Sequence, residues 1–500
     1  MKNKVLFVYS AYENIGIEYL SSILKKNNFN TDLMFFPMLF EDSMLDIDFL
    51  AKLFSIENKI IREYDFSDVL CICFNITTDY YVYFSRIAQK LKKYCPDIPI
   101  IFGGIHSSSA SDEVLNNSFV DYVAIGEGEI SIVELINYIK DKKNKIPKGI
   151  AYKKNNIIQK NSVCEFVFDL DKLPFPDKAL FYDKKDYVAT TYTIFTTRGC
   201  PYNCSYCINN FWYGELYPNE QRVRRRSVDN VIAELKHAKK KFNIKSIMFE
   251  DDIFYLSPKW HWEFISKYKK QINLPFVCVM HPSHCQDYKV IKSLKDAGCI
   301  QVEIGIQTLN EKVRKKYLNR NETNKEITKA LYNLHKAKVK YNIDHIAGLP
   351  DDNIEFHLDA VKLYAKYCPN RILLFFITNY PSTEIEKISL DKGKVSLKDI
   401  DNMRRGLGET DETTGSVSLK DANELERLRF LFGWLPYTGK NITNFLVNTG
   451  LYKILPVNRI FTKILPSIIA TLTGGEPRGE VILKKYLTEI FNFKWFYKFK

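Results

Sequence analysis

The sequence lacks the features that mark membrane-spanning and secreted proteins. No apolar run approaches the roughly 20 residues that a helix needs to cross a bilayer. Residues 1–5 do not have the shape of a signal peptide. The 11 cysteines are an odd number and do not follow the spacing of a secreted disulfide framework. We therefore expect a cytoplasmic protein, in which clustered cysteines bind metal or react more often than they form disulfides.

Length and composition indicate a globular protein of several domains. A chain of 500 residues is too long for one ordinary hydrophobic core. Hydrophobic residues make up 46% and charged residues 26%, which is typical of folded proteins. The formal net charge of +13 would suit nucleic acid, a membrane surface or a phosphate-bearing cofactor. Because the lysines are spread along the chain, we favour an ordinary solvated surface.

Residues 1–150 predict an α/β domain of the flavodoxin-like, doubly wound kind. Short apolar runs alternate with helical patterns, as in a parallel sheet. Residues 151–190 are predicted to form a connector with a hairpin near Asn155 and Asn156. The predicted strands of the first domain are 5–9, 69–74, 98–102 and 120–125.

Residues 191–385 predict a partial (β/α)6 barrel. Its chemistry is expected beyond the carboxyl ends of the strands, as in other parallel α/β folds. The predicted strands are 193–197, 244–249, 275–280, 300–305, 341–347 and 371–377. Residues 386–500 break this pattern and predict a mainly helical region that closes over the barrel mouth and contacts the substrate. Its apolar stretch 454–473 and its basic, aromatic stretch 484–500 leave a membrane-surface contact as a second interpretation.

Three cysteines follow the first barrel strand in one tight loop. Cys200, Cys204 and Cys207 have the spacing Cys-x3-Cys-x2-Cys. Thiolates are the usual ligands of iron–sulfur clusters, and a 4Fe–4S cubane takes four. Three ligands in one loop leave one iron open, as a catalytic site requires. Zinc or incidental thiols are the alternatives, but no fourth ligand with zinc-finger spacing is present.

This loop, with Tyr206 before its third cysteine, resembles the signature of the radical S-adenosylmethionine (SAM) superfamily. The resemblance implies that SAM chelates the open iron and is cleaved to a 5′-deoxyadenosyl radical. It also implies SAM contacts at matching strand ends. A helix cap is the alternative for the acidic cluster, a simple turn explains the glycine equally well, and relatives often carry Glu in place of Gln307. The expected SAM contacts are Tyr206, Glu250, Asp251, Asp252, Glu303, Gln307 and Gly348.

Glycine-containing loops follow two consecutive strands of the first domain, at 103–106 and 126–129. Loops at this position line the ligand crevice of a parallel sheet. In order with the connector and the three-cysteine loop, they resemble the cobalamin-binding class of radical SAM proteins. The expected cobalamin contacts are Asn75, Thr77, Thr78, Gly103, Gly104, His106, Gly126, Glu127, Gly128 and Glu129.

No histidine in the chain lies in the Asp-x-His-x-x-Gly pattern of the best-known cobalamin domains. The resemblance therefore implies a cobalt without a strong axial base, which suits methyl transfer. A degenerate domain that only packs on the barrel is the alternative. The basic run 222–226 leaves RNA binding open, but such runs usually form an exposed basic face.

The resemblance makes methylation of an unactivated carbon, in a small-molecule or natural-product substrate, the leading function. It also implies an external electron donor of the flavodoxin or ferredoxin type. Oxidative cyclisation, as in relatives that act on tetrapyrroles, is the second hypothesis. RNA methylthiolation is a third, but Cys71, Cys73 and Cys95 form no second spaced triad, so no nucleic-acid partner is expected. A non-enzymatic cobalamin or redox sensor would not need an open iron.

Overall fold

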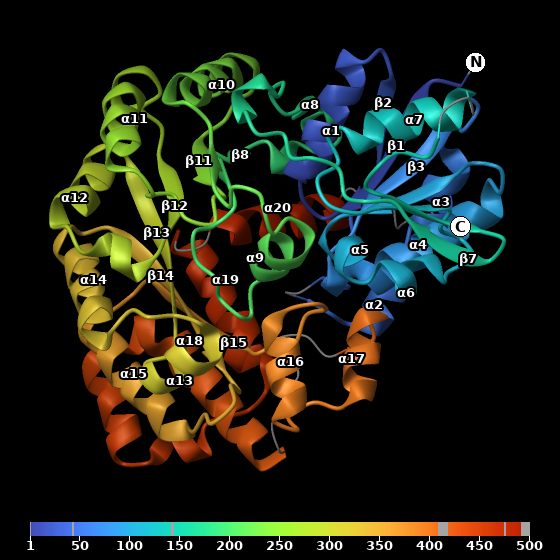
Figure 1. The fold of residues 1–500 in the computed structure, drawn as a ribbon. Helices are drawn as coiled ribbons and strands as arrows, with labels where there is room; N and C mark the ends of the chain where they lie inside the picture. Colours follow the sequence, from blue (N-terminus) through green and yellow to red (C-terminus); the bar gives the residue numbers. More distant parts are fainter. Residues whose placement is uncertain (1, 43–44, 142–144, 409–418, 475–476, 492–500) are drawn as a thin grey trace.

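The computed structural model describes residues 2–42, 45–141, 145–408, 419–474 and 477–491. A sheet in the N-terminal domain and a sheet in the barrel form the two halves of the molecule, and helices cover both (Figure 1). None of the helices in the described ranges has the length and apolar character of a membrane span.

The N-terminal sheet has the strand order β2-β1-β3-β4-β5-β6-β7, and its first five strands are parallel. The order 2-1-3-4-5 confirms the flavodoxin-like prediction. β1 and β3 are almost wholly buried because helices cover both faces, which explains why they read as continuous apolar runs. The strands are β1 (Lys4–Ser10), β2 (Asn30–Phe36), β3 (Val69–Asn75), β4 (Ile100–Gly103) and β5 (Tyr122–Ala124). Their main helices are α1 (Ile15–Lys26), α4 (Tyr81–Tyr94), α5 (Ile105–Ser109), α6 (Ser111–Leu115) and α7 (Ser131–Asp141).

The predicted hairpin belongs to this sheet and not to the connector. β6 (Ile150–Lys154) pairs antiparallel with β5 and with β7 (Ile157–Lys160). Asn155 and Asn156 have φ values of 51° and 62°, which the tight turn requires and asparagine tolerates. The N-terminal sheet therefore extends beyond the expected boundary at residue 150.

The barrel sheet contains six parallel strands in the order β15-β14-β13-β12-β11-β8, which confirms the partial barrel. The strands are β8 (Thr191–Ile194), β11 (Ser246–Phe249), β12 (Phe276–Met280), β13 (Cys299–Gln307), β14 (Lys340–Ala347) and β15 (Arg371–Phe376). The helices between them are α10 (Val228–Lys241), α11 (Pro258–Gln271), α12 (Tyr288–Asp296), α13 (Glu311–Leu318), α14 (Asn324–Lys336) and α15 (Ile354–Tyr367).

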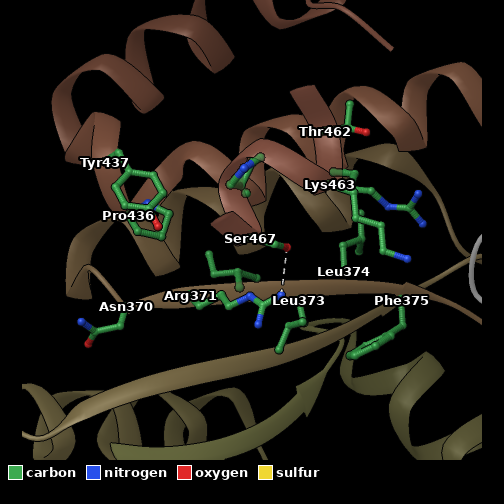
Figure 2. Close-up of a pocket in the computed structure, with 14 residues that line it drawn as sticks. Asn370, Arg371, Leu373, Leu374, Phe375, Pro436, Tyr437, Thr462, Lys463 and Ser467 are labelled. Atoms are coloured by element: carbon green, nitrogen blue, oxygen red, sulfur yellow. Dashed lines mark hydrogen bonds between the residues drawn. The ribbon is translucent and has the colours of Figure 1, made fainter. Parts of the chain in front are cut away.

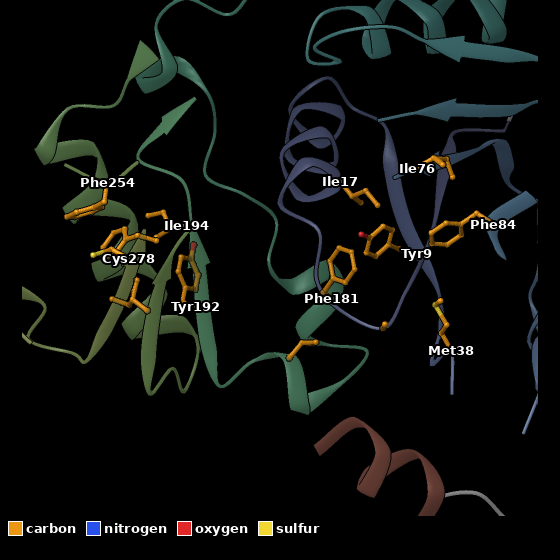
Figure 3. Packing of buried hydrophobic residues seen from close by; sticks show 14 of the residues in the cluster. Tyr9, Ile17, Met38, Ile76, Phe84, Phe181, Tyr192, Ile194, Phe254 and Cys278 are labelled. Carbon is orange, nitrogen blue, oxygen red and sulfur yellow. The ribbon is translucent and has the colours of Figure 1, made fainter. Parts of the chain in front are cut away.

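The connector ties the two sheets together through its short helix α8 (Ala179–Tyr182). Phe181 packs edge-on against Tyr9 of β1, with ring centroids 6.1 Å apart, while Tyr192 of β8 belongs to the barrel core (Figure 3). Lys178 is fully buried and bonds Glu13 and Glu18 of the N-terminal domain at 2.9 and 2.8 Å. An ion so buried needs these partners, so the connector is fixed to the first domain.

The C-terminal region spreads along the molecule and contacts both halves. α18 (Leu419–Asn448) packs against α15 and the edge strand β15, with a kink at Gly439 (φ 66°). α20 (Pro477–Phe491) docks on the N-terminal domain, where Lys485 bonds Asp42 at 2.5 Å with both side chains buried. The other helices are α16 (Glu384–Asp391), α17 (Leu397–Arg404) and α19 (Leu465–Leu472). Residues 492–500, part of the predicted basic stretch, lie outside the described ranges.

Candidate functional site

The three-cysteine loop follows β8 and the short strand β9 (Thr197–Arg198), and two distant elements hold it in place. The backbone N–H of Ser205 donates to the carbonyl of Leu318 at 3.3 Å, and its hydroxyl donates to the carbonyl of Tyr317. The carbonyl of Ser205 accepts from the N–H of Ile385 at 3.0 Å. The ends of α13 and α16 therefore fix the loop between its second and third cysteines.

The three cysteine side chains lie close enough for each to influence the others. The pKa of Cys200 and of Cys207 is raised to about 12, mainly by burial, and the neighbouring thiols contribute to the rise. Within the described ranges, no group of three or more His, Cys, Asp or Glu side chains is arranged to hold a single metal ion. Three mutually close, half-buried thiols in one loop fit a cluster, in which each thiolate binds a different iron.

Of the three acidic residues after β11, Asp252 lies at the cysteine loop. Its charge contributes to raising the pKa of both Cys200 and Cys207, and it accepts a hydrogen bond from Asn209 at 3.0 Å. Asp251 has a different role. Its buried carboxylate accepts from Thr196 N–H and hydroxyl, both at 2.6 Å, and from Thr197 N–H at 2.7 Å. Asp251 therefore anchors the chain just before the loop.

Sequence reasoning missed Arg320, which lies beside the loop. Its guanidinium donates to the hydroxyl of Tyr206 at 3.1 Å, to the carbonyl of Gly305 at 2.8 Å and to the carboxylate of Glu322 at 2.6 Å. Burial raises the pKa of the Cys204 thiol, and the Arg320 charge opposes that shift. Arg320 follows α13 without any motif, so nothing local in the sequence indicated its position.

The end of β13 has an unusual backbone at the expected SAM contact Gln307. Gln307 is buried with φ of 68°, and the β13–β14 pairing shifts register between Gly305 and Gln307. A Cβ on Gly305 would lie 2.4 Å from Gln307 Nε2, so the glutamine side chain passes directly over the glycine. Glu303, two residues before Gly305 on the same strand, is half-buried.

A buried chain of hydrogen bonds supports the loop that contains Gly348. Asp352 Oδ2 accepts from the N–H of Gly348 at 3.1 Å and from His357 Nε2 at 2.9 Å. His357 Nδ1 lies 2.9 Å from His345 Nε2, and His345 Nδ1 lies 3.0 Å from the Tyr364 hydroxyl. With both imidazoles neutral, each contact has one donor and one acceptor, and all donors point toward Asp352. Burial lowers the pKa of His345 well below its ordinary value, in agreement with a neutral ring.

Replacing Asp352→Asn is expected to lower the free energy of unfolding by about 1–3 kcal/mol, because the amide has one oxygen and must leave without an acceptor either Gly348 and His357, which share Oδ2, or the Asn353 N–H, which uses Oδ1. Denaturant unfolding measures the change. Asp359→Asn on α15 is the control, since its side chain is 71% exposed near Lys362. Equal effects of the two substitutions would contradict a supporting role for Asp352.

Two arginines of the barrel bind the acidic loop of the N-terminal domain. Arg198, just before the cysteine loop, bonds Glu129 at 2.6 Å and Glu127 at 3.4 Å. Arg224 forms a bidentate pair with Glu127, one contact of which measures 3.0 Å, and its guanidinium stacks 3.9 Å from Phe166. The structure thus connects the predicted cobalamin loop directly to the predicted cluster loop.

These pairs correct the prediction of an exposed basic face at 222–226. Arg224 and Arg226 are only 2% and 4% exposed. Arg226 bonds Glu234 at 2.5 Å, and Arg225 lies 3.9 Å from the ring of Trp260. The partners of these arginines lie on other elements. The local run of charge therefore led to the wrong prediction that the arginines are exposed.

The carboxyl edge of the N-terminal sheet has the properties of a ligand-binding edge. Asn75 donates to Asn14 at 3.0 Å, and a Cβ on Gly104 (φ 94°) would come within 2.3 Å of Asn75 Oδ1. Buried Thr77 Oγ1 and Ser131 Oγ are among the described polar atoms that have no hydrogen-bond partner. Unpartnered polar atoms and tightly approached glycines at one sheet edge fit a polar cofactor there.

Other predicted cobalamin residues already have protein partners. His106 is fully buried, its Nδ1 lies 3.1 Å from Thr78 Oγ1, and burial lowers its pKa to about 4. Direct contact between His106 and a corrin ring would need its neighbours to move. A Cβ on Gly126 (φ 87°) would meet the Tyr217 hydroxyl at 2.2 Å, and Gly128 packs against Leu20. Gly103 lies in β4, in ordinary contact with its neighbours.

Comparison with known proteins agrees with both halves of this site. The Radical SAM superfamily profile matches residues 194–364, and the B12 binding domain profile matches residues 5–136. An uncharacterized methyltransferase of Pyrococcus horikoshii is 26% identical over 377 residues, which are 74% of this chain and 77% of that protein. An anaerobic magnesium-protoporphyrin IX monomethyl ester cyclase of Rubrivivax gelatinosus is 22% identical over 420 residues, which are 78% and 71% of the two chains.

The fold also matches a solved structure, the cobalamin-dependent SAM radical enzyme OxsB with aqua-cobalamin and SAM bound. The TM-score is 0.65 at 16% identity, and the match covers 97% of this chain and 80% of that one. The three-cysteine barrel defines a radical SAM enzyme. With its N-terminal sheet, the chain belongs to the cobalamin-binding radical SAM superfamily, and its cofactors are a 4Fe–4S cluster, SAM and cobalamin.

Proposed function

We propose that this enzyme transfers a methyl group to an unactivated carbon of a small-molecule or natural-product substrate. The observation that carries the proposal is the link between the two cofactor regions, in which Glu127 and Glu129 pair with Arg224 and Arg198. When bound, cobalamin supplies a methyl carrier, and the cluster with SAM supplies radical chemistry. A substrate held between the two loops would be within reach of both.

The residues that hold the cofactors follow from the geometry. In this proposal Cys200, Cys204 and Cys207 bind three irons, and the fourth iron stays open to SAM. Tyr206, Glu250, Asp252, Glu303, Gln307 and Gly348 remain the proposed SAM contacts. We do not assign SAM to Asp251, because the Thr196–Thr197 segment occupies its carboxylate. The proposal includes an external electron donor of the flavodoxin or ferredoxin type and a cytoplasmic location.

The N-terminal domain divides into residues that contact cobalamin and residues that position the edge. Glu127 and Glu129 act through Arg198 and Arg224, so we propose them as positioning residues. His106 and Thr78 are buried and contact each other, and we propose that they support the carboxyl edge of the N-terminal sheet. The proposed cobalamin contacts are Asn75, Thr77, Gly103, Gly104, Gly126 and Gly128.

A product analysis tests the reaction type. Anaerobically reconstituted enzyme is incubated with reductant, SAM and candidate substrates, and S-adenosylhomocysteine and 5′-deoxyadenosine are quantified by mass spectrometry. Methylation predicts both products, together with a substrate mass gain of one methylene. The Cys204→Ala variant is the control and should form no 5′-deoxyadenosine. Absence of both products from the wild-type enzyme would contradict the proposal.

Oxidative cyclisation is the second candidate, because the Rubrivivax gelatinosus relative is a cyclase that matches most of this chain. It predicts 5′-deoxyadenosine without a stoichiometric amount of S-adenosylhomocysteine, and a product that has lost hydrogens. The same experiment therefore distinguishes the two candidates.

Replacing Arg320→Gln is expected to lower the reduction potential of the cluster by tens of millivolts. Removing a cation beside Cys204 destabilises the more negative, reduced cluster. An anaerobic redox titration followed by electron paramagnetic resonance measures the shift. Arg320→Lys keeps the charge and should restore most of the potential. Lys316→Gln, whose side chain on α13 is 58% exposed, is the control, and an equal shift there would contradict a local effect of Arg320.

A further inference from the structure

One long segment of the C-terminal region carries charge of a single sign. Residues 427–475 contain no aspartate or glutamate, although these make up 59 of the 500 residues of the chain. The cations in the same segment are Arg427, Arg429, Lys440, Lys453, Arg459 and Lys463. The side chains of Lys440 and Lys453 are exposed. The residues of the segment itself therefore carry only positive charge, and Arg429 among them is paired with Glu426, just before the segment, at 2.7 Å.

The same segment exposes large apolar side chains. Ile454 is 80% exposed, Leu472 70% and Phe445 57%. They come from the end of α18, from the 3-10 turn η6 (Leu451–Ile454) and from α19, with the π-helical turn η7 (Ile460–Ile464) between them. η6 and η7 pack against α18, and η7 packs against α19. Exposed apolar groups gathered on adjoining elements indicate an interaction surface.

A cavity next to this surface is lined by two cations of the segment and by Arg371 of β15. It lies between β15 and the helices of the segment, and its lining includes Arg371, Arg429 and Lys463 (Figure 2). Arg371 donates to the Ser467 hydroxyl at 3.1 Å, and Tyr437, on the same wall, is 38% exposed. Among the described residues that line this cavity none is acidic. Glu426, just before the segment, accepts from Arg429 at 2.7 Å and from Thr462 at 3.2 Å, so the exposed side chains of Lys440 and Lys453 are the cations offered to an anionic group.

We propose that this C-terminal surface docks the enzyme on an anionic phospholipid bilayer. Exposed aliphatic side chains would enter the acyl boundary while Lys440 and Lys453 contact phosphate groups, which is the behaviour of interfacial helices. RNA phosphates would bind the cations, but RNA provides no apolar environment for the exposed Ile and Leu side chains. A second copy of the chain would bring like charges together, which opposes pairing through this surface. The bilayer is the partner that satisfies both properties.

Vesicle co-sedimentation of the full-length holoenzyme tests this proposal. We expect binding to vesicles of phosphatidylcholine mixed with phosphatidylglycerol to be about tenfold or more tighter than to phosphatidylcholine alone. Leu472→Glu and Phe445→Glu should each weaken binding by about tenfold. The controls are Leu397→Glu, at 72% exposure, and Phe168→Glu, at 63%, which introduce the same charge elsewhere on the molecule and should leave binding unchanged.

Lys453→Glu should reduce the preference for anionic vesicles without lowering the thermal stability of the protein. The proposal is overturned if the wild-type enzyme binds neither vesicle, or if the Leu472 and Leu397 variants lose binding equally. A dimer in analytical ultracentrifugation that Leu472→Glu dissociates, with no vesicle binding, would identify a second copy as the partner and also overturn it.

Discussion

Gly199→Ala is expected to abolish assembly of the cluster. A Cβ at this position would lie 1.8 Å from the backbone oxygen of Arg222 and 2.5 Å from the Tyr213 hydroxyl. Gly199 also has φ of 86°, which alanine adopts only with strain. The backbone contact cannot relax by a side-chain rotation, so the segment before Cys200 must move. We expect loss of about 3 kcal/mol or more of stability, together with most of the bound iron.

Iron and sulfide content per chain, with thermal unfolding, measure this effect. Gly214→Ala is the matched control, because its Cβ would meet only the side-chain oxygen of Asn210, at 3.3 Å. Retention of cobalamin by Gly199→Ala would show that the damage is local to the cysteine loop. Iron content equal to that of Gly214→Ala would contradict the role given to Gly199.

The sequence predicts features whose residues are close together in the chain. The cysteine spacing, Tyr206 and the hairpin at Asn155 and Asn156 are local patterns, and their meaning needs no knowledge of the fold. Most strands of both sheets also follow from the sequence, because strands of a parallel sheet buried on two faces appear as continuous apolar runs. β2 was missed because its first three residues, starting at Asn30, are polar and partly exposed.

Ion pairs between distant residues escape this kind of prediction. Arg224 and its partner Glu127 are 97 positions apart, and Arg320 is 114 positions from Tyr206. Local composition suggested a solvated face for the arginine run, because solvation is the default for unpartnered charge. The buried arginines instead join two domains, which only their relative placement reveals. Partners of this kind need the three-dimensional structure.

Arg198→Met is expected to lower the free energy of unfolding by about 3–5 kcal/mol at neutral pH, because it leaves Glu129 buried without its main partner. Burial favours a raised pKa for Glu129, but the charge of Arg198 outweighs it and leaves that pKa below the ordinary value. In the wild-type protein this carboxyl therefore stabilises the fold above its unfolded pKa, and the contribution is lost as pH falls through the lowered value.

In Arg198→Met the contribution of Glu129 to stability depends on pH in the opposite direction. Without the guanidinium, burial raises the pKa of Glu129, so the stability deficit grows as pH rises through that value and shrinks in acid. Adding Glu129→Gln removes the buried charge and should recover part of the loss. Denaturant unfolding of the two single variants and the double variant, across pH, gives the coupling energy, which we expect to be about 3 kcal/mol.

The exposed pair Lys292–Asp296 on α12 provides the comparison for this cycle. Its coupling should be about 0.3–0.5 kcal/mol and insensitive to pH near neutrality. A coupling for Arg198–Glu129 no larger than this would mean that the two residues do not hold the domains together. A large coupling accompanied by loss of both iron and cobalamin would show that the same pair aligns the cluster loop with the edge of the N-terminal sheet, since neither residue is itself a proposed ligand of either cofactor.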